Sequence, residues 1–87
     1  MSYRVELVPA AQRDLRKLPR EAQTRMAAPI LALAQDPRPA GARKLRGEDL
    51  TWRIRVGAYR VVYDIDDERT LVVVLKVARR GEATYTR

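Results

Sequence analysis

Three arginines of a predicted β-hairpin have the chemistry and the spacing to bind an anion together. Arg53 and Arg55 belong to a segment, 50–56, in which apolar and polar residues alternate, and Arg60 belongs to a second such segment, 59–65. Strict alternation is typical of strands with one buried face, and it places the arginines of each strand on the other face. Guanidinium groups are planar forks of donors that fit a phosphate, so the predicted chemistry is phosphate binding.

The turn between the two segments predicts which arginines face each other. Gly57 and Ala58 fit a two-residue type II′ hairpin turn, which favours glycine at its first central position. The resulting register sets Arg55 directly opposite Arg60, with Arg53 two residues away on the same face. The same register pairs apolar residues with each other on the opposite face: Val56 with Tyr59, Ile54 with Val61, and Trp52 with Tyr63. A slip of one residue would bury the arginines instead.

Like charges that face each other across a sheet are destabilising, by a few tenths to about 1 kcal/mol. A phosphate between Arg55 and Arg60 would replace this repulsion with charge-assisted hydrogen bonds. The alternative is a solvated sheet face on which Asp64 or Glu82 pairs with the arginines. The inferred pairing favours the anion site over this alternative.

Two residues near the C-terminus extend the pattern. The segment 71–77 is apolar on both faces except for Lys76, which predicts a central strand covered on both sides, and Arg80 and Tyr85 follow it. If this strand lies beside the hairpin, Arg80 and Tyr85 leave it near one end of the arginine face. A tyrosine offers an ionisable hydroxyl and a ring that stacks on bases. Taken alone, Tyr85 is better interpreted as a hydrophobic cap on the core.

Composition narrows the function classes. The 87 residues predict a single domain, and the net charge of +7 favours a nucleic acid or another acidic partner. The chain has no Cys and no His, which excludes a disulfide scaffold, a thiolate zinc site, a cysteine nucleophile and the usual general base. We expect no metal and no cofactor. The absence of an apolar signal segment and of about 20 consecutive apolar residues predicts a cytoplasmic location and no membrane partner.

The elements that must position these residues give an α+β fold, 1–87. An alternating strand over 3–8 is followed by an amphipathic helix from Pro9 and a second helix from Pro19 that ends at Asp36-Pro37. A basic connector, 40–49, leads to a three-stranded antiparallel meander. We predict a four-stranded sheet made of the N-terminal strand and the meander, with a two-helix hairpin on one face.

With these residues placed, the chain resembles the RelE/ParE superfamily of toxins from type II toxin–antitoxin systems. The resemblance spans nearly the whole chain. It rests on Tyr3-Arg4-Val5, the segment 11–18, Asp36-Pro37, Lys44-Leu45-Arg46-Gly47, the segment 52–63, Val77-Ala78-Arg79-Arg80 and Tyr85. Each piece alone is weakly specific, whereas the ordered set at these spacings in a short chain is fairly specific.

The resemblance implies an RNA-cleaving function. RelE-like members cleave messenger RNA in the ribosomal A site, using basic residues on the sheet and a C-terminal tyrosine. Carried over to this chain, the catalytic set is Arg53, Arg55, Arg60, Arg80 and Tyr85. The implied reaction is attack of the 2′-hydroxyl on the adjacent phosphate, without a metal. Further basic residues are expected to dock on ribosomal RNA: Arg13, Arg16, Lys17, Arg20, Arg43, Lys44 and Arg46. Many of these are equally consistent with a solvated helix face.

One departure from the family pattern concerns proton transfer. RelE-type enzymes often carry lysines at the positions of Arg53 and Arg55, and arginine cannot act as a base. The base is then Tyr85 or remains unassigned.

Two rival functions are considered: a ParE-like inhibitor of DNA gyrase, and a degenerate module that only binds RNA or an acidic partner.

The resemblance also implies partners. We expect a co-encoded, acidic antitoxin that wraps the domain, besides messenger RNA and ribosomal RNA. Binding to promoter DNA is expected only through the antitoxin complex. The charge of +7 favours electrostatic steering of an acidic partner.

Overall fold

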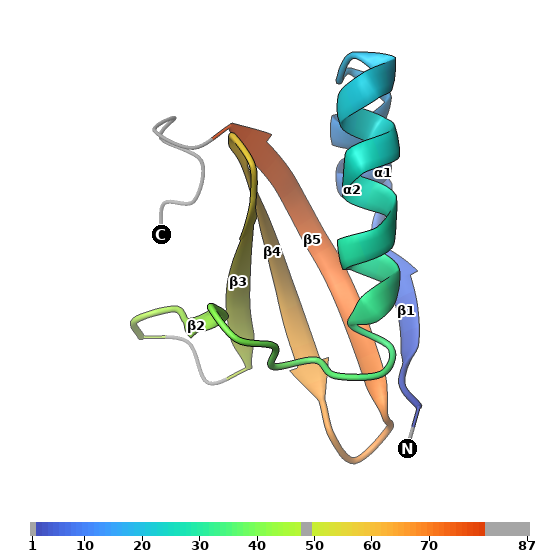
Figure 1. Ribbon diagram of the computed structural model, residues 1–87. Coiled ribbons are helices and arrows are strands. Elements are labelled where there is room, and N and C mark those ends of the chain that lie inside the picture. The colour runs from blue at the N-terminus through green and yellow to red at the C-terminus, as the bar shows by residue number, and fades with distance from the viewer. Residues whose placement is uncertain (1, 48–49, 80–87) are drawn as a thin grey trace.

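The computed structural model describes residues 2–47 and 50–79. Within them the chain forms an α+β fold in which both helices lie on the same face of a sheet (Figure 1). In chain order the elements are β1 (Arg4–Leu7), α1 (Pro9–Arg16), α2 (Arg20–Ala32), β2 (Arg43–Lys44), β3 (Thr51–Val56), β4 (Tyr59–Asp66) and β5 (Leu71–Arg79). The predicted order of one strand, two helices and an antiparallel meander is confirmed. None of the described helices is long and apolar enough to cross a membrane.

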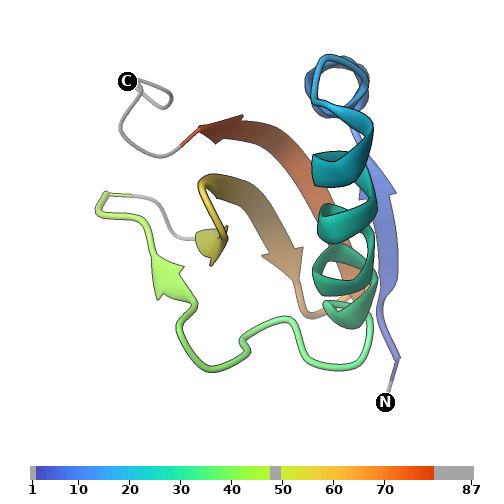
Figure 2. The same cartoon turned by 45° about the horizontal axis from the view of Figure 1, so that its top comes forward.

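The sheet has five strands in the order β1-β5-β4-β3-β2, not the four that we predicted. The fifth is β2, in which Arg43 pairs with Arg53 and Lys44 pairs with Trp52. A strand of two residues is too short to show any alternation, so the sequence reads as a connector there. The sheet is mixed, because β1 runs parallel to β5 while the other pairs are antiparallel. Figure 2 shows β2 at the opposite edge of the sheet from β1.

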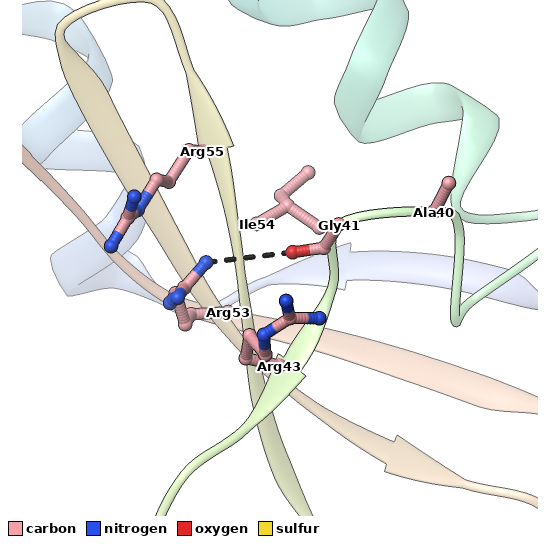
Figure 3. Close-up of a pocket in the computed structure, with 6 residues that line it drawn as sticks. All are labelled: Ala40, Gly41, Arg43, Arg53, Ile54 and Arg55. Atoms are coloured by element: carbon pink, nitrogen blue, oxygen red, sulfur yellow. Dashed lines mark hydrogen bonds between the residues drawn. The ribbon is translucent and has the colours of Figure 1, made fainter.

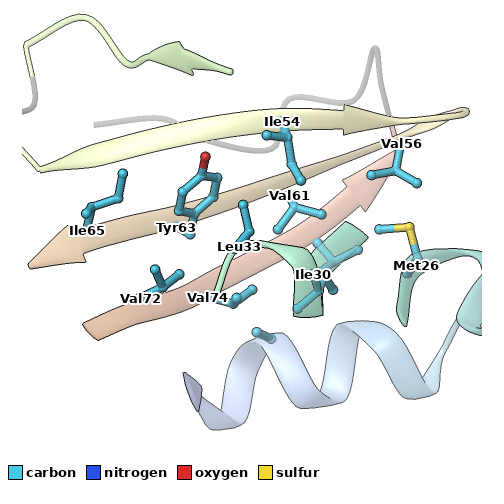
Figure 4. Close-up of a cluster of buried hydrophobic side chains, with 12 residues drawn as sticks. Met26, Ile30, Leu33, Ile54, Val56, Val61, Tyr63, Ile65, Val72 and Val74 are labelled. Carbon is cyan, nitrogen blue, oxygen red and sulfur yellow. The ribbon is translucent and has the colours of Figure 1, made fainter. Parts of the chain in front are cut away.

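The core lies between the helices and the face of the sheet that they cover (Figure 4). The residues buried there come from both helices, from the turn after α2 and from the three long strands: Ala11, Met26, Ile30, Leu33, Ile54, Val56, Val61, Tyr63, Ile65, Val72, Val74 and Val77. The alternating residues of β3 and β4 point to the faces predicted for them. The opposite face carries the polar residues of these strands and defines the surface considered below.

The β3–β4 hairpin has the register predicted from its turn. Gly57 has a φ of +58°, and Thr70 is the only non-glycine residue with positive φ in the described part of the chain. Ala58 therefore keeps the ordinary sign, as a type II′ turn requires. The predicted pairs of Val56 with Tyr59, Ile54 with Val61, Trp52 with Tyr63 and Arg55 with Arg60 are all present.

A β-bulge interrupts the pairing of β4 with β5. Val62 pairs with Lys76, whereas the next residue, Tyr63, pairs with Val74, so Leu75 is an extra residue on β5. A bulge shifts the alternation of side chains by one position. Lys76 therefore lies on the face away from the helices, while Val77 is buried in the core with 4% exposure. The strand is central as predicted, but helices cover only one of its faces.

Candidate nucleic-acid interface

Five cations occupy the face of the sheet opposite the helices, and we call this surface the basic face. Its members are Arg43, Arg53, Arg55, Arg60 and Lys76. The strand register arranges them in two rows that run across the sheet. One row runs from Arg43 through Arg53 and Val62 to Lys76, and the other runs from Arg55 through Arg60 to Ala78. Neighbouring strands are about 4.8 Å apart, so the long side chains of each row can reach one ligand.

The basic face is not neutralised by described carboxylates. Within residues 2–47 and 50–79, no ion pair is formed by Arg55, Arg60 or Lys76. Asp64, one of the two acids that could have paired with the arginines, instead accepts a 2.6 Å hydrogen bond from the Thr51 hydroxyl. Glu82, the other acid, lies outside the described residues. Other parts of the sheet and helices do pair their charges, as in Arg4 with Glu6 and Arg38 with Asp67.

Arg60 is the residue of the basic face whose surroundings best suit a bound anion. Its side chain is half-buried, and its Nε is buried with no hydrogen-bond partner among the residues that the structure describes. A buried donor left unpaired costs about 1–3 kcal/mol. A guanidinium does not deprotonate in proteins, so the group cannot relieve this cost by losing its charge. An anionic oxygen at Nε would remove the cost and add a charge-assisted bond.

A hollow of about 270 Å³ opens at the outer edge of β3 beside the basic face. It is lined by Ala40, Gly41, Arg43, Arg53, Ile54 and Arg55. In Figure 3, Arg53 and Arg55 project to one side of β3 and Ile54 projects to the other, as their alternation predicts. The Nη1 of Arg53 donates a 3.5 Å hydrogen bond to the Gly41 carbonyl, which ties β3 to the connector before β2.

A polar cluster on another part of the surface holds the start of the connector, 40–49, which contains Arg43. Arg38 lies over the Trp52 ring, 5.3 Å from its centroid, and its Nη2 lies 2.8 Å from Asp67 Oδ2. The Tyr3 hydroxyl donates a 2.6 Å bond to the same carboxylate. The hydrogen bonds from Arg38 and Tyr3 lower the pKa of Asp67. This cluster fixes the start of the connector and so helps to position β2.

The structure brings together only part of the predicted site. Arg53, Arg55 and Arg60 share one face as predicted. The predicted positions of Arg80 and Tyr85 lie outside the described residues. The seven predicted docking residues fall into two separate groups. Arg13, Arg16, Lys17 and Arg20 lie on α1 and at the start of α2, whereas Arg43, Lys44 and Arg46 lie on β2 and the turn after it, at the far edge of the sheet.

Lys76 belongs to the basic face, although the sequence interpretation did not include it in the site. Uninterrupted alternation along β5 would place it beside Val72 and Val74, under the helices. The signal that could have found it is the spacing of the buried valines, which changes from two residues to three before Val77. A lysine in the centre of a strand that would otherwise bury it favours a bulge at that point.

The described residues offer no obvious metal centre. No group of three or more carboxylate side chains lies together in the described part of the chain, which also has no His or Cys. Because its side chains are cationic, this surface suits anionic ligands. Its strand pairing, the lack of a described ion pair at Arg55 and Arg60, and the lone Nε of Arg60 together fit the phosphates of a nucleic acid.

Comparison with known proteins shows which family this chain belongs to. Residues 5–84 match the sequence profile of the ParE toxin of type II toxin–antitoxin systems, parDE. Toxin RelG of Mycobacterium tuberculosis is 37% identical over 87 residues, which cover 94% of this chain and 95% of RelG. A chain of the RelBE2 toxin–antitoxin complex of M. tuberculosis superposes with a TM-score of 0.82 at 36% identity, covering 92% of this chain and 100% of that one.

An archaeal relative agrees. A chain of the RelE–RelB complex of Pyrococcus horikoshii superposes with a TM-score of 0.83 at 32% identity, covering 95% of this chain and 100% of that one. These matches extend over almost the entire length of the chain. The protein belongs to the RelE/ParE superfamily of type II toxin–antitoxin toxins and is similar to its RelE members.

Proposed function

We propose that this protein is an endoribonuclease toxin that cleaves messenger RNA in the ribosomal A site. The observation that carries the proposal is the basic face, where Arg55 and Arg60 are paired across two strands without a described acidic partner. The similarity to RelE toxins supports the same activity. Two like charges that face each other repel, and an anion bound between them replaces this repulsion with charge-assisted hydrogen bonds.

The proposed reaction is a transesterification. The 2′-oxygen of one nucleotide forms a bond to the adjacent phosphorus, and the bond from that phosphorus to the 5′-oxygen of the next nucleotide breaks. The 2′-hydroxyl gives up a proton and the leaving 5′-oxygen takes one up. The products are a 2′,3′-cyclic phosphate and a 5′-hydroxyl, so no water and no metal enters this step.

The arginines suit one part of this reaction. Negative charge builds on the phosphoryl oxygens in the transition state, and fixed cations stabilise it most at that point. We assign this role to Arg60 together with Arg53, Arg55 and Arg80. None of these guanidinium groups can accept the proton of the 2′-hydroxyl. We assign base stacking or proton transfer to Tyr85, and docking on ribosomal RNA to the two separated basic groups described above.

We further propose that a co-encoded antitoxin neutralises the toxin. The RelBE2 and P. horikoshii structures are toxin–antitoxin complexes. A net charge of +7 favours fast association with an acidic partner, and acidic or apolar residues of the antitoxin would cover the basic face. Binding to promoter DNA would then proceed through the antitoxin rather than through this chain.

The direct test is cleavage by purified protein on ribosomes that carry a defined message. Replacing Arg60 with glutamine should lower the cleavage rate by about 100- to 1000-fold, because one group that stabilises charge in the transition state is lost. Arg69→Gln is the matched control. It removes the same charge from an exposed residue in the β4–β5 turn, where Arg69 pairs with Asp66 at 3.8 Å. Equal activity of the two variants would refute the role of the basic face.

A gyrase-directed function is the second candidate, because the matching family profile carries the ParE name. The two activities leave different damage in cells that express the toxin. Messages cut at defined positions within codons, with intact DNA, support RNA cleavage. Broken DNA with intact messages supports gyrase inhibition, and growth without arrest supports a module that only binds.

A further inference from the structure

We infer that the basic face holds two consecutive phosphates of one RNA strand, and that Lys76 binds the phosphate next to the one that reacts. The inference rests on the proposed function and assigns the chemical class of a second subsite. The reacting phosphate lies at Arg55 and Arg60, and its neighbour lies at Lys76 in the second row. Arg53 belongs to the second row but is only two residues from Arg55, so its long side chain can contact either phosphate.

The spacing of the two rows supports two phosphates rather than one. Arg60 and Val62 are two residues apart on β4, and Arg53 and Arg55 are two residues apart on β3. Two residues of a strand span roughly 6.8 Å. This separation is comparable to the step that one nucleotide makes between neighbouring phosphates along an extended strand. A single phosphate cannot contact both rows symmetrically, whereas two consecutive phosphates of one strand can.

The shape of the second row also fits an anion. Val62 lies in the middle of it, between Arg53 on one neighbouring strand and Lys76 on the other. Valine is short and its side chain is 1% exposed, so it forms a floor between two long basic side chains. Lys76 is half-buried and forms no ion pair with a described carboxylate.

The β-bulge in β5 determines the face on which Lys76 lies. The bulge at Leu75 turns Lys76 away from the helices. Directly after it, the backbone N–H of Val77 donates a 3.0 Å hydrogen bond to Asp14 Oδ2 on α1. The pairing of β1 with β5 stops at Val74, so Asp14 supplies the acceptor that β1 does not supply there. A helix carboxylate thus anchors the strand where its alternation shifts.

Lysine occurs only in the second row, at Lys76, whereas the cations of the first row are arginines alone. Arginines offer several donors in a rigid plane, which suits a phosphorus centre whose charge increases during reaction. Lysine is a compact charge on a flexible stem and suits a phosphate that is only held in place. Holding the neighbouring phosphate orients the nucleotide for attack, because binding to a part that does not react fixes the geometry of the part that does.

The test uses the purified chain and short fluorescent tetranucleotides of 2′-deoxy residues, which cannot be cleaved. In one set, a single phosphate is replaced by an uncharged methylphosphonate at each position in turn. Binding is measured by anisotropy over a range of salt concentrations. For wild type, the inference predicts that neutralising either of two adjacent phosphates weakens binding.

The variants identify which row holds which phosphate. Lys76→Gln should reduce the slope of log binding constant against log salt by about 0.7, the value for one contact to a single strand. In Lys76→Gln, one of the two methylphosphonates should no longer weaken binding. Lys76→Arg should keep the wild-type salt slope and the wild-type response to both methylphosphonates. Arg69→Gln is the control, since Arg69 is exposed in the β4–β5 turn, where it pairs with Asp66 at 3.8 Å. It should change neither the slope nor the penalties.

Two results would overturn the inference, and both leave the proposed function standing if Arg60→Gln still abolishes cleavage. One is a Lys76→Gln variant that keeps the wild-type salt slope and both methylphosphonate penalties while its circular dichroism shows a folded chain. The other is a wild-type protein whose tetranucleotide binding does not depend on salt. Conversely, a confirmed second subsite in a protein that cuts no RNA would refute the proposed function alone.

Discussion

At the scale of single residues, the basic face combines a cost to stability with a gain in binding. Arg55 lies opposite Arg60, and Arg60 keeps a buried Nε without a described partner. A sequence selected for stability alone would place an opposite charge or an uncharged residue at one of these positions. The arrangement therefore has the trade-off between stability and activity that is common at functional sites.

The repulsion can be measured. Arg55→Gln should raise the free energy of unfolding of the free toxin by a few tenths to about 1 kcal/mol at low salt, because it removes one of two facing charges. The gain should shrink as salt is added, since Arg55 is exposed and screened. Urea unfolding at two salt concentrations checks this. Arg4→Gln, which breaks the pair with Glu6, should give no such gain. A loss of stability on replacing Arg55 would contradict the account.

At the scale of elements, the bulge in β5 and its anchor on α1 decide which side chains reach the basic face. If side chains alternated along β5 without the bulge at Leu75, Lys76 would lie under the helices and Val77 on the opposite face. The carboxylate of Asp14 accepts the Val77 N–H and holds the strand after the shift. An α1 residue thereby supports a site on the opposite side of the sheet.

This support predicts a local effect of Asp14→Ala. The variant should lose about 1–3 kcal/mol of stability, because a partly buried N–H loses a charged acceptor. Hydrogen exchange of the Val77 amide should become faster by more than that of core amides in β4. Gln12→Ala is the control, since Gln12 only donates to the Leu7 carbonyl on the exposed side of α1. Unchanged protection of Val77 would show that the bulge does not depend on Asp14.

The hairpin and the bulge show how far the sequence predicts the elements. The alternation in 50–56 and 59–65, with Gly57 and Ala58 between them, was sufficient to predict each cross-strand pair and the shared face of Arg53, Arg55 and Arg60. It could not predict β2, because a strand of two residues is too short to show alternation. It also missed Lys76, because a bulge changes which face a residue occupies without leaving a strong mark in a short apolar segment.

At the scale of the whole molecule, tertiary contacts determine which basic residues share a surface. The distance along the chain from Arg20 to Arg43 does not reveal that Arg20 begins a helix on one face of the sheet, whereas Arg43 lies on the edge strand β2. The seven docking residues consequently form two surfaces and not one. The same limit applies to Tyr63, whose partner is the carbonyl of Pro37, 26 positions away in the sequence, at 2.7 Å.

The burial of Tyr63 at this contact makes the stability of the fold depend on pH. Burial raises the pKa of Tyr63 to about 12, and the nearby Arg38 and Asp36 shift it in opposite directions. Because the folded value lies above the unfolded value of about 10, the stabilisation is complete below pH 10 and is lost as the pH rises toward 12. Urea unfolding between pH 8 and pH 11.5 should show this decline.

Tyr63→Phe provides the comparison. It should lower the free energy of unfolding at pH 7 by about 1–3 kcal/mol, because the carbonyl of the buried Pro37 loses its donor. The difference between the two proteins should then narrow as the pH rises, since only wild type has this hydroxyl to ionise. A difference that stays constant up to pH 11.5 would contradict the assignment.

The most direct test of the central claim is nuclear magnetic resonance of the Arg60 Nε–H group during titration with RNA. The probe is a short 2′-O-methyl RNA, which cannot be cleaved because its 2′-oxygen carries no proton. If the basic face binds phosphate, the Arg60 signal should move and its exchange with water should slow at saturation, while the Arg69 signal in the β4–β5 turn stays in place. An Arg60 signal that does not respond while the RNA binds elsewhere would contradict the account.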